Sequence, residues 1–130
     1  MSKHDAATRV LVIDDQIDTA VYLEIALSVA GFEPVVCTEN AERYFDQSFD
    51  VALVDLLLSN DTTGIGLIRQ LSEAGVPVVG MTGMPADAQI VQEAIDAGAR
   101  VILHKPFDLA TIKAHIHSAM TGEPIEIQVG

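Results

Sequence analysis

The fold of this chain is decided by the stretch Phe49-Asp50-Val51-Ala52-Leu53-Val54-Asp55. Its apolar run is too short for a buried helix and is bounded by polar residues, so it predicts a strand that is covered on both faces. Asp55 stands where this strand ends, and open α/β sheets place their chemistry at the carboxyl ends of their strands. The stretch therefore predicts a central strand and a functional carboxylate together.

Other strand-like runs of the chain also end beside polar side chains. They are residues 10–13 before Asp14 and Asp15, residues 76–81 before Thr82, and residues 101–103 before Lys105. If these strands are parallel, their carboxyl ends share one edge of the sheet. Three carboxylates, one hydroxyl and one ammonium group are then expected to meet there.

The composition restricts the class of protein and its partners. A chain of 130 residues, 49% of them hydrophobic, is long enough for one compact domain with a core. Its formal net charge of −12 disfavours direct contact with nucleic acid or with an anionic membrane surface. Neither a leader nor a long apolar span is found, so we expect a cytoplasmic location. Cys37 is the single cysteine and is expected to be a buried strand thiol.

Strand-like and helix-like stretches alternate along the chain. Strands are expected at 9–13, 33–37, 49–55, 77–81 and 100–103, and helices at 18–30, 41–47 after Asn40, 65–73, 86–97 and 108–120, the last capped by Asp108. This alternation predicts a parallel sheet with helices on both faces, and right-handed crossovers favour the doubly wound, flavodoxin-like (βα)5 order 2-1-3-4-5. One domain at 9–121 is expected between a flexible start at 1–8 and a tail at 122–130.

The polar residues at the strand ends resemble a known pattern. Together, Asp14-Asp15, Asp55, Thr82 and Lys105-Pro106-Phe107 resemble the receiver domain of two-component response regulators, over about residues 9–120. The resemblance implies that Asp55 is the phosphoacceptor. It would receive a phosphoryl group from a phosphohistidine of a sensor histidine kinase or of a histidine-phosphotransfer protein.

The same resemblance implies a metal site and roles for the remaining polar residues. Asp15 would bind Mg²⁺ or Mn²⁺ directly, Asp14 mainly through water, and Asp55 and the backbone carbonyl of Leu57 would complete the protein ligands. Lys105 and Thr82 would be the catalytic and switch residues, and the Lys105-Pro106 peptide would be cis. The chemistry agrees, because three crowded carboxylates repel one another and Mg²⁺ favours carboxylate and phosphate oxygens. Phosphoryl transfer mainly needs positioning and neutralised charge.

Two positions depart from the family pattern, and two more match its positions for tuning dephosphorylation. Ile102 stands where family members commonly carry the aromatic switch residue, so any signal is expected to travel through Thr82 and residues 83–88. Ser59 replaces a frequent proline, which affects the loop and not the phosphorylation site. Leu57 and Met84 resemble the family's positions for tuning dephosphorylation. Because both side chains are apolar, neither orients an attacking water, and slow autodephosphorylation is expected.

The first helix has two possible interpretations. Val21, Ile25 and Val29 recur at helical spacing, while the expected core-facing stripe is made by Tyr22, Leu23, Ala26 and Leu27. If the first set faces water, it forms an apolar strip that suits a helical phosphodonor. Otherwise, the helix is buried on an unusually wide face. The tail at 125–129 alternates like a strand and either pairs with a sheet edge or is a flexible end.

Two classes of function remain open at this point. The favoured one is a stand-alone response regulator that signals through a downstream protein or relays the phosphoryl group, and that is an enzyme only toward its own phosphorylation. By resemblance, a homodimer would use the face of strand 100–103 and its two neighbouring helices, at 86–97 and 108–120. The alternative is a phosphohydrolase of the haloacid-dehalogenase type, although that family places an Asp-x-Asp pattern after its first strand. A flavodoxin that binds FMN is disfavoured by the acidic edge.

Overall fold

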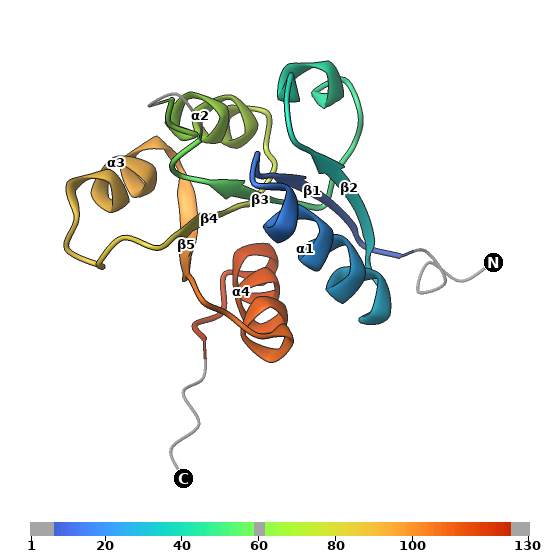
Figure 1. Ribbon diagram of the computed structural model, residues 1–130. Coiled ribbons are helices and arrows are strands. Elements are labelled where there is room, and N and C mark those ends of the chain that lie inside the picture. The colour runs from blue at the N-terminus through green and yellow to red at the C-terminus, as the bar shows by residue number, and fades with distance from the viewer. Residues whose placement is uncertain (1–6, 59–61, 126–130) are drawn as a thin grey trace, which may run out of the picture.

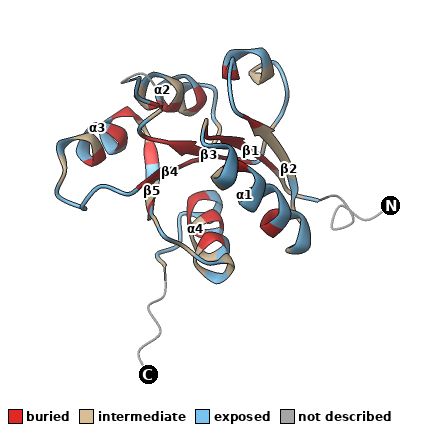
Figure 2. Ribbon diagram, in the orientation of Figure 1, coloured by how far each residue is buried: buried red, intermediate tan, exposed pale blue. Residues whose placement is uncertain are grey.

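The sheet of this protein has five parallel strands in the predicted order β2-β1-β3-β4-β5. The computed structural model describes residues 7–58 and 62–125. The strands are β1 (Arg9–Ile13), β2 (Glu33–Cys37), β3 (Val51–Asp55), β4 (Val78–Thr82) and β5 (Ala99–His104). All five residues of β3 are buried, as its apolar run predicts (Figure 2). The flavodoxin-like fold class is confirmed.

Two pairs of helices cover the two faces of the sheet (Figure 1). The helices are α1 (Ile17–Val29), α2 (Ile65–Glu73), α3 (Gln89–Ala97) and α4 (Leu109–Thr121). One cluster of buried side chains joins α2 and α3 to the sheet, and a second joins α1 and α4 to its other face. Because each face is covered in this way, the chemistry is confined to the edges of the sheet. None of the helices in the described ranges has the length and apolar character needed to cross a membrane.

The connection between β2 and β3 differs from the prediction. It contains a 3₁₀ helix, η2 (Ala41–Tyr44), where an α-helix over 41–47 was expected. Asn40 has a φ of 55°, and its side chain caps nothing. The guanidinium of Arg9 donates to the Ser48 carbonyl oxygen at 2.7 Å, and the Arg9 amide donates to Asp50 Oδ2 at 2.8 Å. These bonds hold residues 48–50 beside the start of β1, so the chain leaves the helical path soon after η2.

The other helix ends agree with the prediction except at one place. Asp108 caps α4, because its Oδ1 accepts from the Thr111 amide at 2.8 Å. The α3 helix begins only at Gln89, so the residues from 86 to 88 form a turn where helix was expected. At its far end, α4 is joined to the start of β5, since Arg100 Nη1 donates to the Ala119 carbonyl oxygen at 2.8 Å. The predictions for residues 1–6, for Ser59 and for the tail beyond Ile125 lie outside the described residues.

The apolar strip of α1 faces solvent. Val21, Ile25 and Val29 are 48%, 59% and 76% exposed, while Leu23 and Leu27 are fully buried. The prediction that Tyr22 belongs to the core stripe is wrong, because its side chain is 43% exposed and its ring lies 6.5 Å from the Phe107 ring. The α1 helix therefore has apolar residues on both its core-facing side and its solvent-facing side, and only the core-facing side is buried.

Candidate functional site

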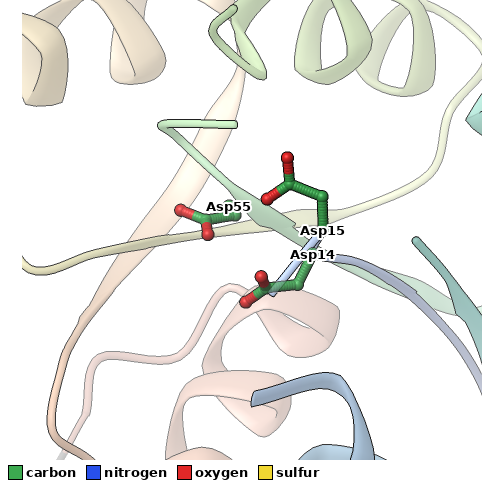
Figure 3. A group of neighbouring side chains, drawn as sticks. All are labelled: Asp14, Asp15 and Asp55. Atoms are coloured by element: carbon green, nitrogen blue, oxygen red, sulfur yellow. The ribbon is translucent and has the colours of Figure 1, made fainter. Parts of the chain in front are cut away.

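Three aspartates gather at the carboxyl edge of the sheet, as predicted. Asp14 directly follows β1, Asp55 ends the adjacent strand β3, and Asp15 lies beside them (Figure 3). One carboxylate oxygen from each lies within 4.8 Å of the others. Asp14 is fully buried and Asp55 is 4% exposed. We call these three residues the carboxylate cluster.

Backbone hydrogen bonds hold the carboxylate cluster in place. The Asp14 amide donates to the Cys37 carbonyl oxygen at 3.2 Å, which continues the pairing of β1 with β2 beyond the strand end. Asp14 Oδ1 accepts from the Gln16 amide at 2.9 Å, and Asp55 Oδ1 accepts from the Leu57 amide at 3.2 Å. The carboxylates of Asp14 and Asp55 are thus each oriented by the loop that follows their strand.

Lys105 brings a positive charge to the carboxylate cluster. Its Nζ lies 3.1 Å from Asp55 Oδ2 and 3.5 Å from Asp14 Oδ2. The Lys105 amide donates to the Thr82 carbonyl oxygen at 2.8 Å, so the residue is held beside the end of β4. The Lys105-Pro106 peptide bond is cis, as the resemblance implies. The lysine therefore approaches the cluster from the β5 side.

The electrostatics of Asp55 favour a bound cation. Burial and then the charge of Asp14 raise the pKa of Asp55, the Lys105 ammonium lowers it, and the resulting pKa is about 6. Lys105 is the cation that the described residues place against Asp14 and Asp55. Closely spaced carboxylate oxygens are the ligands that a hard divalent cation requires. The residues present fit a metal ion such as Mg²⁺.

Thr82 lies at the end of β4, one residue beyond the partner of Asp55 in the strand register. Its side chain is 2% exposed, and its Oγ1 accepts from the Met84 amide at 3.0 Å. Leu57 and Met84 are 46% and 39% exposed, so both predicted tuning positions present apolar side chains at the rim. The hydroxyl hydrogen of Thr82 is left to donate elsewhere.

Ile102 lies away from this rim. It pairs with Gly80 in the register of β4 and β5, and a Cβ placed on Gly80 would come 3.0 Å from Ile102 Cδ1. The isoleucine is half-buried against the cluster of α2 and α3. It therefore packs as a core side chain over the glycine.

Gly64 is a site residue that the sequence analysis missed. A Cβ on Gly64 would collide with the carbonyl oxygen of Asp55 and would come 2.9 Å from Val54 Cγ1. The Gly64 amide donates to the Leu56 carbonyl oxygen at 2.9 Å, so the loop after β3 folds directly over the strand end. The sequence signals only a turn here, because close backbone approach leaves no mark besides the glycine itself.

Gly64→Ala is expected to lower the free energy of unfolding by about 1–3 kcal/mol, because the added methyl group has no space beside the Asp55 backbone. Gly66→Ala is the matched control, since a Cβ there meets nothing within 4 Å and the residue is helical. Urea unfolding of both variants measures the effect. Equal stability of the two variants would contradict the close approach.

Comparison with known proteins agrees with this geometry. A family model described as the response regulator receiver domain matches residues 10–117. The chain is 29% identical over 126 residues to the DNA-binding response regulator MtrA of Mycobacterium tuberculosis, covering 92% of this chain and 54% of MtrA. It is 22% identical over 120 residues to the response regulator ArlR of Staphylococcus saprophyticus, covering 90% and 54%. The chain thus spans about half the length of these relatives.

Solved structures show the same fold. The chemotaxis protein CheY4 of Vibrio cholerae superposes with a TM-score of 0.79 at 23% identity, covering 88% of this chain and 99% of that one. A two-component response regulator from Clostridium difficile superposes with a TM-score of 0.75 at 26% identity, covering 87% and 95%. The strand order and the edge that carries the carboxylate cluster are therefore those of a known fold.

Proposed function

Because the chain belongs to the response regulator receiver domain family, we propose that Asp55 is its phosphoacceptor and that a phosphohistidine is the donor. The donor would be a sensor histidine kinase or a histidine-phosphotransfer protein. One observation carries the proposal: Asp55 ends the central strand, inside the carboxylate cluster and 3.1 Å from Lys105 Nζ. Neither the family match nor the similar solved structures support the phosphohydrolase alternative.

The transfer step is a displacement at phosphorus. A carboxylate oxygen of Asp55 forms the new P–O bond while the P–N bond to the donor imidazole breaks, and the imidazole keeps the electron pair and takes a proton. With its pKa near 6, Asp55 is mostly ionised at neutral pH and able to attack. Lys105, which already contacts Asp55 Oδ2, would then bind a phosphoryl oxygen.

The metal ligands would be Asp14, Asp15, Asp55 and the backbone carbonyl of Leu57, with Mg²⁺ or Mn²⁺ as the ion. When bound, the ion would supply positive charge against the carboxylates and the phosphoryl oxygens. The chain itself contributes the orientation, since the amides of Gln16 and Leu57 hold Asp14 and Asp55.

Thr82 provides a route for the signal without an aromatic residue at Ile102. Its Oγ1 already accepts from the Met84 amide, and its hydroxyl hydrogen is available to a phosphoryl oxygen on Asp55. A shift of this hydroxyl toward Asp55 would pull on the Met84 amide and on the turn that precedes α3. Residues 83–88 would therefore carry the change to the α3 surface.

Transfer from a phosphohistidine donor tests the proposed function directly. With Mg²⁺ present, we expect about one phosphoryl group per chain, released by hydroxylamine as an acyl phosphate, and none with a chelator. Many turnovers of small phosphate esters per chain would reject a receiver function. Assembly through the face of α3, β5 and α4, a downstream protein target and a stand-alone role remain predictions.

Leu57→Asn is expected to hasten autodephosphorylation about tenfold, which corresponds to about 1.4 kcal/mol from one hydrogen bond that orients the attacking water. Leu57 lies next to the proposed phosphoacceptor, because the Leu57 amide donates to Asp55 Oδ1, and its side chain is exposed. Decay of the phosphorylated chain after donor removal measures the rate. Ile95→Asn, which alters an exposed isoleucine on α3, is the control, and equal decay of both variants would count against this role.

The α1 strip is the surface proposed to dock the donor. It consists of Ile17, Val21, Ile25 and Val29, which are spaced by four residues and are all exposed. The helix begins two residues after Asp15, so the strip starts beside the carboxylate cluster. An apolar helical stripe of this kind suits the apolar face of a partner helix.

Ile25→Glu is expected to slow transfer from the cognate donor about 10–100-fold, because a charge would be buried in the contact. Phosphorylation by acetyl phosphate should be unchanged, since that donor needs no docking. Ile95→Glu is the matched control, because Ile95 is 47% exposed on another helix and Ile25 is 59% exposed. An unaltered transfer rate in Ile25→Glu would exclude this docking surface.

A further inference from the structure

A cavity of about 720 Å³ opens between η2 and α2, beside the carboxylate cluster. We call it the η2–α2 cavity. Its apolar lining comes from the ends of β1 and β2 and from both flanking helices, and includes Ile13, Cys37, Ala41 and Leu67. The cavity lies at the carboxyl ends of β1 and β2, next to the point where the strand order reverses, and doubly wound folds place ligands at such points.

The charged groups that line the η2–α2 cavity all have the same sign. They are Asp15, Glu39 and Glu42, and no lysine, arginine or histidine occurs among its lining residues in the described part of the chain. Arg43 belongs to η2, where its guanidinium lies 5.3 Å from the centroid of the Tyr44 ring and brings one positive charge near Cys37. Burial raises the pKa of the Cys37 thiol, so this residue adds no further charge near neutrality. Three carboxylates against this one guanidinium leave a net negative charge at the cavity, which favours cations over phosphates and carboxylates.

We propose that the η2–α2 cavity binds a linear organic cation, an aliphatic chain with primary ammonium groups, as in the diamines and polyamines. The aliphatic chain would lie on the apolar lining, and the ammonium groups would donate to Glu39, Glu42 and Asp15. The volume falls within the range of about 300–1,000 Å³ found for small-molecule sites. A metal ion alone would leave the apolar lining without a partner.

The cavity is linked to the carboxylate cluster through Asp15, which belongs to both. A cation in the cavity and a divalent ion in the cluster would draw on the same negative charge. Each is therefore expected to weaken the other, and by the same factor, because coupling between two sites is reciprocal. This link rests on the proposed metal site, whereas binding to the cavity does not depend on it.

Isothermal titration of the full chain with spermidine and with 1,5-diaminopentane, in metal-free buffer of low ionic strength, tests the proposal. We expect one saturable site. Glu39→Gln and Glu42→Gln should each weaken binding about tenfold, the effect of losing one charge-assisted hydrogen bond. Glu73→Gln is the matched control, because Glu73 is an exposed acid at the end of α2 that does not line the cavity. It should leave the affinity unchanged.

A second variant fills the cavity and keeps every carboxylate. Gly66 lines the cavity, and a Cβ added there meets nothing within 4 Å. Gly66→Leu should therefore abolish binding while the chain still folds, since leucine favours the helix that contains this residue. The proposal would be overturned if Gly66→Leu still bound spermidine, or if Glu73→Gln weakened binding as much as Glu39→Gln does. Either result would mean that spermidine is attracted by the acidic surface in general. Tighter binding of a lysine tripeptide than of spermidine would overturn the small-molecule assignment.

The link to the carboxylate cluster has its own test. Saturating Mg²⁺ should weaken diamine binding severalfold in the wild-type chain, beyond the effect of the same ionic strength from NaCl. If Mg²⁺ does not weaken diamine binding, then either no metal binds at the carboxylate cluster or Asp15 does not serve both sites. The proposed binding of a diamine in the cavity would be unaffected by that result. Failure of the diamine titration, with phosphorylation of Asp55 intact, would reject the cavity proposal and keep the proposed function.

Discussion

Asp55→Asn is expected to abolish phosphorylation of the chain, by at least about a thousandfold, because a carboxamide oxygen does not form a stable acyl phosphate. The substitution keeps the local geometry, since asparagine has nearly the same shape and its oxygen still accepts from the Leu57 amide. Incorporation of radiolabelled phosphate from a phosphohistidine donor measures the loss.

Asp46→Asn is the matched control for this variant, because Asp46 is exposed in the connection between β2 and β3. Its labelling should equal that of the wild-type chain. If Asp55→Asn is still labelled to nearly the wild-type stoichiometry, another residue is the phosphoacceptor. The proposed role of Asp55 would then be wrong.

The stability of the metal-free protein is expected to fall as the pH rises from about 4 to about 7. The pKa of Asp55 is raised to about 6 in the folded chain from its ordinary value of 3.8. The folded state therefore binds a proton that the unfolded state has lost, and stability decreases as that proton leaves. The whole shift corresponds to up to about 3 kcal/mol. Urea unfolding in the presence of a chelator, at steps across this pH range, measures the change.

The difference in unfolding free energy between wild type and Asp55→Asn isolates this carboxylate from the other titrating groups. We expect the variant to be the more stable of the two at pH 7 in chelator, and the difference to vanish near pH 4. Mg²⁺ at about a hundred times its dissociation constant should add about 2.7 kcal/mol to the wild type at pH 7. If the unfolding free energies of the two proteins change in parallel with pH, then Asp55 titrates normally. That result would contradict the raised pKa of Asp55 in the carboxylate cluster.

Much of the architecture could be predicted because few alternatives compete with it. The run before Asp55 is apolar at every position, which favours a strand within a parallel sheet. Right-handed crossovers leave few strand orders, and 2-1-3-4-5 is a common one among them. Asp14, Asp15, Asp55 and Lys105 come together because the parallel strands end at one edge. The roles assigned to these residues remain proposals.

The features that were missed depend on contacts between distant residues. Residues 41–47 have helical propensity, but the bonds from Arg9 to the end of this connection outweigh it and leave only η2. Tyr22 fits the apolar period of α1, yet it lies at the border of the buried stripe, where its ring faces Phe107. Gly64 is fixed by the backbone of Asp55, and the local sequence gives no sign of that approach.

The attachment of α4 to the start of β5 has a practical consequence. Because Arg100 bonds the Ala119 carbonyl oxygen, α4 finishes at the opposite edge of the sheet from Asp55, and the chain also enters β1 from that side. A fluorophore, surface tether or fused partner joined near residue 7 or residue 125 would therefore project away from the aspartates. Immobilised protein should keep its reactive edge open to solution, which makes single-molecule measurement of phosphoryl transfer feasible.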